Sequence, residues 1–122
     1  MKLTLIITTF NWPEALSIVL KSVAQQTIFP DEIIIADDGS DERTRNLIIS
    51  LNKNLNLNII HSWQEDKGFR ASMSRNKAIQ KSSGDYIVLI DGDSILHPNF
   101  IRDHIEIAEL RFFVQGSRVL IS

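Results

Sequence analysis

Two carboxylates one residue apart, Asp91 and Asp93, follow the apolar run "YIVLI" at residues 86–90. Like charges this close repel each other, and carboxylates at the end of a buried strand also lose hydration. A divalent cation would offset both costs, because Mg²⁺ and Mn²⁺ favour carboxylate and phosphate oxygens. The spacing also allows one carboxylate to bind a ribose hydroxyl, and Asp and Gly are common in plain polar turns. Gly92 should keep the turn open and leave room for a ligand.

A second pair of carboxylates, Asp37 and Asp38, ends another apolar run. Carboxylates at this position can accept hydrogen bonds from the N–H groups of a nucleobase or from ribose hydroxyls. A strand-to-helix turn capped by Ser40 or Asp41 explains the same residues. Both readings can hold at once, with Ser40 as the cap and Asp38 as a ligand-binding residue. Asp37 has the alternative of a structural pair with a basic residue.

Basic residues that suit a diphosphate lie around a segment of helical periodicity. Arg70 precedes it, and Arg75 and Asn76 lie within it. The planar donor fork of arginine matches the geometry of phosphate oxygens. A solvent-exposed helical face is the alternative for Arg75.

The histidines and most of the aromatic residues do not form a recognisable site. The three histidines have no partner at ligand spacing, so we expect structural or exposed roles for His61, His97 and His104. We expect packing rather than stacking roles for Trp12, Trp63 and Phe69. Phe10 is the exception, because it lies at a strand end near the expected site.

Four apolar segments rich in β-branched residues alternate with four segments of helical periodicity. This alternation predicts an α/β fold, a Rossmann-like βαβαβαβ parallel sheet with helices on both faces, in a single domain over residues 1–122. Ligands of such folds bind at the carboxyl ends of the strands. The residues after the strands should therefore line one crevice. The expected strands are 2–7, 31–36, 57–62 and 86–90, and the expected helices are one capped by Asn11, one capped by Ser40 or Asp41, 71–81 and 98–110.

Composition excludes several classes of protein. The chain has 122 residues, a formal net charge of −2 and no cysteine, so nothing indicates a nucleic-acid partner, a disulfide or a thiolate metal site. No apolar run approaches the ~20 residues of a membrane span, and the first residues lack the features of a signal peptide. We expect a cytoplasmic protein, and the inner face of the membrane is a compatible location.

Five segments occur in a recognisable order: "LIITTFNWPEAL", "SVAQQT", "EIIIADDGSDERT", "GFRASMSRNKAI" and "GDYIVLIDGDSILHPNF". Together they resemble the family 2 glycosyltransferases, whose nucleotide-diphospho-sugar transferase fold is called GT-A. The block "QEDKGFRASMSRN" is also similar to bacterial polysaccharide polymerases of the chondroitin type and to related lipopolysaccharide or capsule transferases. The resemblance covers nearly the whole chain, and the ordered set is specific although each motif alone is weak.

The resemblance implies a nucleotide-diphospho-sugar donor, with UDP as its nucleotide, and a saccharide acceptor in cell-surface polysaccharide biosynthesis. Thr8, Phe10 and Glu14 match the first loop, which holds the nucleoside in the family. Asp38 matches the carboxylate that contacts the uracil edge, with Asp37 beside it.

The resemblance also implies a divalent cation, Mn²⁺ or Mg²⁺, which bridges the diphosphate. Arg70, Arg75 and Asn76 match the block near the diphosphate. Asp91 and Asp93 match the D-x-D pair, in which the first carboxylate tends to touch the ribose and the second binds the metal. Loss of the nucleoside diphosphate is then metal-assisted, as an acceptor hydroxyl attacks the sugar.

One departure from the family concerns catalysis. Inverting members carry an acidic base well beyond the D-x-D, and none of the later carboxylates, Asp103, Glu106 and Glu109, resembles that motif. The catalytic residue is therefore unknown, and we expect an incomplete, nucleotide-binding half of a transferase. The apolar residues within 112–121 need a cover, which predicts a homodimer through this segment.

Two alternatives from other classes remain open. The first is a non-catalytic nucleotide-binding module, which the missing base favours. The second is a phosphohydrolase of the haloacid dehalogenase type, in which Asp91 would be the nucleophile. That motif usually lies near the N-terminus, and Ile95 occupies a position where Thr or Val is usual.

Overall fold

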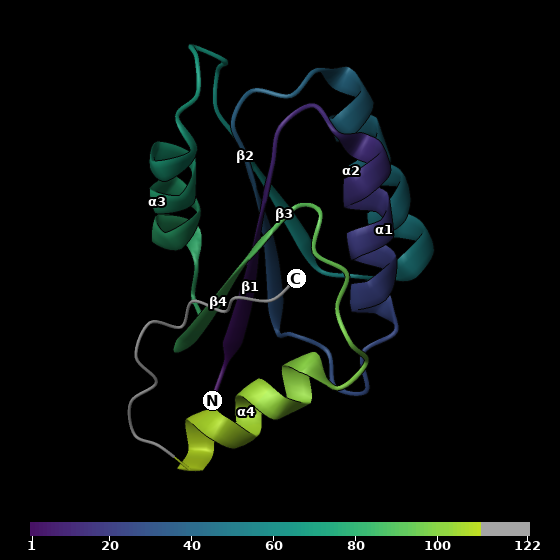
Figure 1. Cartoon of the computed structure of the whole chain (residues 1–122), viewed down its shortest axis with the longest axis vertical. Helices are drawn as coiled ribbons and strands as arrows, with labels where there is room; N and C mark the ends of the chain where they lie inside the picture. The colour runs from purple at the N-terminus through teal and green to yellow at the C-terminus, as the bar shows by residue number, and fades with distance from the viewer. Residues whose placement is uncertain (111–122) are drawn as a thin grey trace.

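The computed structural model describes residues 1–110. Strands and helices alternate along this part of the chain, as the sequence predicts (Figure 1). The elements are β1 (Leu3–Thr9), α1 (Pro13–Ala24), β2 (Glu32–Asp37), α2 (Glu42–Leu55), β3 (Ile59–Trp63), α3 (Ala71–Lys81), β4 (Tyr86–Asp91) and α4 (Phe100–Leu110).

The strands form one parallel sheet in the order β3-β2-β1-β4, so the predicted α/β architecture is confirmed. The first strand of the chain therefore lies between β2 and β4. Thr8 at its carboxyl end pairs with Ala36 on one side and with Asp91 on the other. This register brings the chain segments that follow β1, β2 and β4 to the same edge of the sheet.

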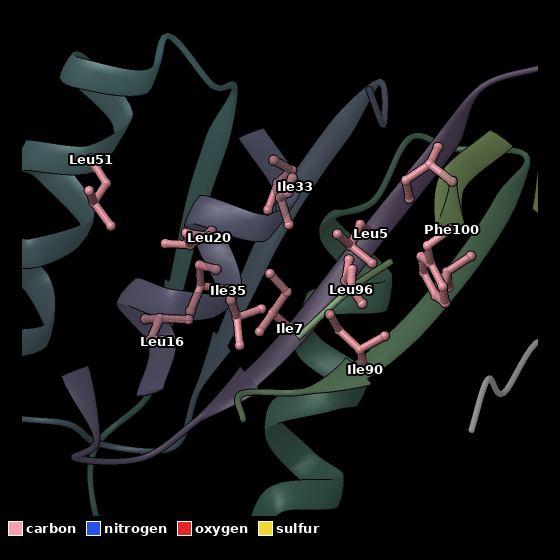
Figure 2. Packing of buried hydrophobic residues seen from close by; sticks show 14 of the residues in the cluster. Leu5, Ile7, Leu16, Leu20, Ile33, Ile35, Leu51, Ile90, Leu96 and Phe100 are labelled. Atoms are coloured by element: carbon pink, nitrogen blue, oxygen red, sulfur yellow. The ribbon is translucent and has the colours of Figure 1, made fainter. Parts of the chain in front are cut away.

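Helices cover both faces of the sheet, with α1 and α2 on one side and α3 on the other (Figure 1). Residues alternate between the faces along each strand. Leu5, Ile7 and Ile35 face α1 and α2 in the larger core cluster, which Figure 2 shows from close by. Ile6 and Ile34 belong to a smaller cluster on the opposite face. That second cluster is completed by Ala36 and by Ala78 of α3.

The fourth strand is less buried than the sequence indicates. Val88 and Ile90 are buried, but Ile87 and Leu89 are only partly so. The reason is the position of β4 at one edge of the described sheet, where a strand has a neighbour on one side only.

The first helix does not begin with the predicted Asn11 cap. The N-cap residue is Trp12, whose side chain makes no capping hydrogen bond. Asn11 has a left-handed φ of 46°, and its Oδ1 accepts a hydrogen bond from the backbone N–H of Asp41 at 2.8 Å. The side chain thus joins two loops instead of capping α1, so Glu14 has no capping box to complete. The second helix does begin as predicted, because Asp41 accepts a hydrogen bond from the backbone N–H of Arg43 at 3.0 Å.

Two further expectations concern membranes and self-association. None of the helices within residues 1–110 is long and apolar enough to cross a bilayer. The segment 112–121, for which we predict a dimer contact, lies outside the described residues.

Candidate functional site

A hollow of about 340 Å³ opens at the carboxyl ends of β1, β2 and β4. It lies where the topology of a parallel α/β sheet places ligands. Its walls come from four separate segments of the chain. The residues that line it are Thr8, Thr9, Phe10, Trp12, Ala36, Asp38, Phe69, Ala71, Ser74, Arg75, Asp91, Gly92 and Asp93.

The two adjacent carboxylates Asp37 and Asp38 lie on opposite faces of the sheet, because side chains alternate along a strand. Asp38 follows Ile34 and Ala36 on the α3 face and lines the hollow. Asp37 is fully buried on the other face. Its Oδ1 accepts a hydrogen bond from the backbone N–H of Ser40 at 2.9 Å, and its Oδ2 pairs with Nε2 of His61 at 2.7 Å. Asp37 is thus in the structural pair with a basic residue, and it does not reach the hollow.

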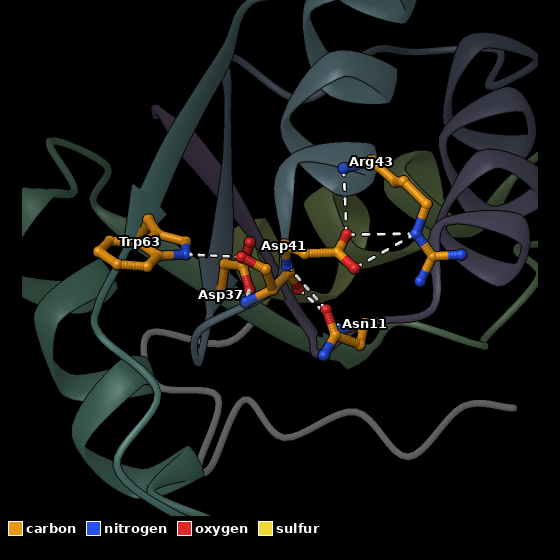
Figure 3. A network of polar contacts seen from close by, with 6 residues as sticks. Asn11, Asp37, Asp41, Arg43 and Trp63 are labelled. Atoms are coloured by element: carbon orange, nitrogen blue, oxygen red, sulfur yellow. Dashed lines mark hydrogen bonds and ion pairs between the residues drawn. The ribbon is translucent and has the colours of Figure 1, made fainter.

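The loop that follows Asp37 is held by a network of polar contacts (Figure 3). Ser40 accepts a hydrogen bond from the backbone N–H of Asn11 at 2.8 Å, and its carbonyl oxygen accepts one from the indole N–H of Trp63 at 3.0 Å. Ser40 therefore stabilises the β2–α2 connection without capping α2. Of the two predicted caps, Ser40 is wrong and Asp41 is confirmed. This network keeps Asp38 at a fixed place on the wall.

The carboxylate of Asp38 is held in a defined orientation. Its Oδ1 accepts a hydrogen bond from Nε2 of Gln64 at 2.6 Å, and its Oδ2 accepts one from the backbone N–H of Arg70 at 2.7 Å. Each carboxylate oxygen can accept a second hydrogen bond. Asp38 is therefore anchored and still able to accept a hydrogen bond from a ligand.

The turn after β4 carries the other two carboxylates of the hollow. Asp91 Oδ1 lies 3.4 Å from the hydroxyl of Thr8, a long contact. Asp93 makes no hydrogen bond or ion pair with any other described residue. Gly92 lines the hollow, and a Cβ at this position would collide with the carbonyl oxygen of Thr8. The missing side chain lets the turn lie directly against β1.

Charge in the hollow favours a cation. Three carboxylates, Asp38, Asp91 and Asp93, face one guanidinium, that of Arg75. A diphosphate would meet net negative charge there unless a cation joined it. The free oxygens of Asp91 and Asp93 fit Mg²⁺ or Mn²⁺, which take a few carboxylate ligands and fill the other positions with water and phosphate. No cluster of three metal-binding side chains occurs within residues 1–110.

Of the three predicted residues around α3, only Arg75 lines the hollow. The guanidinium of Arg70 turns back on its own loop, where Nη2 donates to the carbonyl oxygen of Glu65 at 2.9 Å. Asn76 is exposed one helical step beyond Arg75, and Glu14 is exposed on the first turn of α1. The structure therefore does not bring Arg70, Asn76 and Glu14 into the hollow.

Aromatic side chains form the rim of the hollow. Phe10, Trp12 and Phe69 are 46%, 55% and 90% exposed. The predicted packing roles of Trp12 and Phe69 are therefore wrong, and Trp63 is also half-exposed, at 50%. Large exposed aromatic rings around a hollow are typical of sites that bind a flat ligand by stacking.

The sequence did not indicate Ala71 and Ser74 as wall residues, although a signal for them exists. Both line the hollow together with Arg75. Ala71 lies four residues before Arg75 and three residues before Ser74 on α3. Once Arg75 is placed in the hollow, residue 71 must follow, because positions i and i+4 share a helical face.

Residues 4–122 match the family model described as Glycosyl transferase family 2. A hyaluronan synthase of Pasteurella multocida is 39% identical over 109 residues, which are 88% of this chain and 11% of the relative. A chondroitin synthase of Escherichia coli is 28% identical over 106 residues, 86% of this chain and 15% of the relative. The chain thus spans less than a sixth of the length of these two relatives.

Among solved structures, TarS of S. aureus, residues 1–349 in complex with UDP, superposes with a TM-score of 0.80 at 25% identity. The superposition covers 100% of this chain and 39% of that chain. The predicted GT-A fold and the predicted similarity to chondroitin-type polymerases are both confirmed by these matches. The chain belongs to glycosyl transferase family 2.

Proposed function

We propose that the hollow binds a nucleotide-diphospho-sugar, with UDP as its nucleotide, together with Mn²⁺ or Mg²⁺. One observation carries the proposal: Asp38, Arg75 and the pair Asp91 and Asp93, which are far apart in the sequence, meet in one hollow at the carboxyl ends of the strands. Similarity to TarS, which was solved in complex with UDP, supports the choice of nucleotide.

Each wall residue has a role that its position supports. Asp38 accepts a hydrogen bond from the base, while Thr8 and Phe10 border the nucleoside. Arg75 binds the diphosphate through its donor fork. Asp91 binds the ribose or the cation, and Asp93 binds the cation.

Four residues that the sequence suggested as ligand contacts have other positions or roles. Arg70 acts through its backbone N–H, which orients the carboxylate of Asp38. Glu14 and Asn76 are exposed outside the hollow and are left out of the proposed contacts. Asp37 is also left out, because it is fully buried beside Ser40 and His61 and does not line the hollow.

We propose further that the protein transfers the sugar to a saccharide acceptor in cell-surface polysaccharide biosynthesis. A bound cation would stabilise the negative charge that develops on the departing nucleoside diphosphate. Asp93 and Asp91 would hold that cation, and Arg75 would hold the diphosphate. The similarity to a hyaluronan synthase and a chondroitin synthase supports a polysaccharide role.

A non-catalytic nucleotide-binding module is the second candidate. It is favoured by the positions of Asp103, Glu106 and Glu109, which are exposed on α4 and do not line the hollow. The phosphohydrolase alternative does not agree with membership of glycosyl transferase family 2.

A competition titration with UDP, CDP and ADP in the presence of Mn²⁺ tests the proposed nucleotide. UDP should bind best, because the N–H of the uracil imide faces an acceptor in Asp38, where cytosine and adenine place no such donor. Equal affinity for the three nucleotides would contradict the assignment. Incubation with a UDP-sugar and a saccharide acceptor then separates the two candidates, because only a transferase forms the glycoside.

A further inference from the structure

One buried hydroxyl in the wall of the hollow has no hydrogen-bond partner among the described residues, that of Ser74. The residue is 3% exposed. A buried hydroxyl usually finds a partner, and a helical serine commonly donates to a carbonyl one turn back. Ser22 on α1 does so, with its hydroxyl 2.6 Å from the carbonyl oxygen of Val19. Ser74 leaves its hydroxyl unsatisfied, which indicates a partner that arrives with a ligand.

Ser74 belongs to the part of α3 that forms a wall of the hollow. Ala71, Ser74 and Arg75 line the hollow from one face of the helix. One turn further on, Ala78 is fully buried against Ile34 of the sheet. Ser74 therefore lies between the open part of the hollow and the core.

Ser74 lies at the Asp38 end of the hollow. Helix α3 packs against β1, β2 and β3. Asp38 follows β2 and binds the backbone N–H of Arg70, one turn before Ser74. Asp91 ends β4 and Asp93 follows it, on the other side of β1. The helix that carries Ser74 thus packs on the strand that leads to Asp38 and is joined to Asp38 through Arg70.

Asp38 offers an acceptor and Ser74 offers a donor in the walls of the same hollow. The uracil imide presents the complementary pattern, an N–H flanked by carbonyl oxygens. Cytosine presents an acceptor nitrogen at the same place, so it fits this pair poorly. We propose that the hydroxyl of Ser74 donates to the C4 carbonyl oxygen of uracil, next to the N–H whose hydrogen bond Asp38 accepts. Cytosine carries an amino group at this position, which makes Ser74 a specificity-determining residue for uracil. This inference rests on the proposed function.

The test compares Ser74→Ala with the unmodified chain, and Ser50→Ala serves as control because Ser50 is exposed on α2, outside the hollow. Affinities are measured for uridine, for UDP with Mn²⁺ and for pyrophosphate with Mn²⁺. Loss of one neutral hydrogen bond should weaken uridine and UDP equally, by about fivefold. Pyrophosphate affinity should not change. The ratio of UDP to CDP affinity should fall by a similar factor.

Stability gives an independent readout. Removing an unsatisfied buried hydroxyl should leave the unfolding temperature of the ligand-free protein unchanged or raise it. A purely structural role for Ser74 would lower that temperature and leave the ratio of UDP to CDP affinity unchanged.

Two results would overturn the inference about Ser74 alone: unchanged UDP affinity in Ser74→Ala, or weaker UDP and pyrophosphate binding with unchanged uridine binding, which would place the hydroxyl at the phosphates. A different result, no binding of UDP or uridine by the unmodified chain, would overturn the proposed function together with this inference.

Discussion

Replacing Gly92 with alanine should disturb the site through a single methyl group. The added Cβ would collide with the carbonyl oxygen of Thr8, and it would lie 3.3 Å from the carbonyl carbon of Thr8 and 3.4 Å from Cβ of Thr9. These atoms belong to the central strand β1, which is paired on both sides and cannot easily move. The turn that carries Asp91 and Asp93 must therefore shift away from β1.

The expected cost of Gly92→Ala has two parts. Overpacking against a rigid backbone destabilises a fold by about 1–3 kcal/mol. Gly92 has no left-handed φ, so backbone strain adds nothing to this figure. Displacement of both flanking carboxylates should weaken Mn²⁺-dependent UDP binding by roughly tenfold or more, which is about 1.4 kcal/mol. Urea unfolding followed by circular dichroism measures the first part, and calorimetry below the unfolding transition measures the second.

Gly68→Ala is the matched control. Gly68 has a φ of +87°, so alanine is strained there, but a Cβ at this position would have no neighbour within 4 Å. The control should lose about 1–2 kcal/mol of stability from the left-handed backbone and keep its UDP affinity. If Gly92→Ala keeps both the stability and the UDP affinity of the unmodified chain, the turn does not lie as close to β1 as described.

Two further predictions separate structural from ligand-binding groups. Asp37→Asn should lower the free energy of unfolding by about 1–3 kcal/mol, because the amide leaves one acceptor oxygen where the carboxylate offered two to Ser40 and His61, and it should not change UDP affinity. A loss of affinity in the folded protein would argue against the placement of Asp37 on the face away from the hollow. Burial lowers the pKa of His104 below 6.5, and its Nδ1 lies 2.9 Å from the hydroxyl of Tyr86. As the pH falls, the unfolded chain therefore binds a proton at His104 before the folded chain does, so the unfolding temperature should fall as the pH drops below about 6.5. An equally steep fall in His104→Phe would show that His104 is not the cause.

The order and type of the elements followed from the sequence because strand and helix periodicities alternate clearly along the chain. The sequence did not predict which side of the sheet each residue of β2 faces, for a physical reason. All six residues from Glu32 to Asp37 are buried, so no alternation of polar and apolar residues marks which side faces α3. The sequence could therefore not tell that Asp38 faces the hollow and Asp37 faces away.

The loops were predicted less well than the strands and helices. Asn11 looked like a helix cap, but it binds the backbone of a distant loop, a contact between residues 30 positions apart. Trp12 and Phe69 looked like core residues by composition, yet both are exposed at the rim of the hollow. Such positions depend on tertiary contacts between loops, which local patterns do not encode.

The central claim is that Asp91 and Asp93 hold a cation that binds a nucleoside diphosphate in the hollow. Calorimetric titration of UDP with and without Mn²⁺ tests it directly, in the unmodified chain, in Asp93→Asn and in the exposed control Asp103→Asn. Mn²⁺ should strengthen UDP binding in the unmodified chain and in the control, and it should have little effect in Asp93→Asn. The same UDP affinity with and without Mn²⁺ in the unmodified chain would contradict the claim.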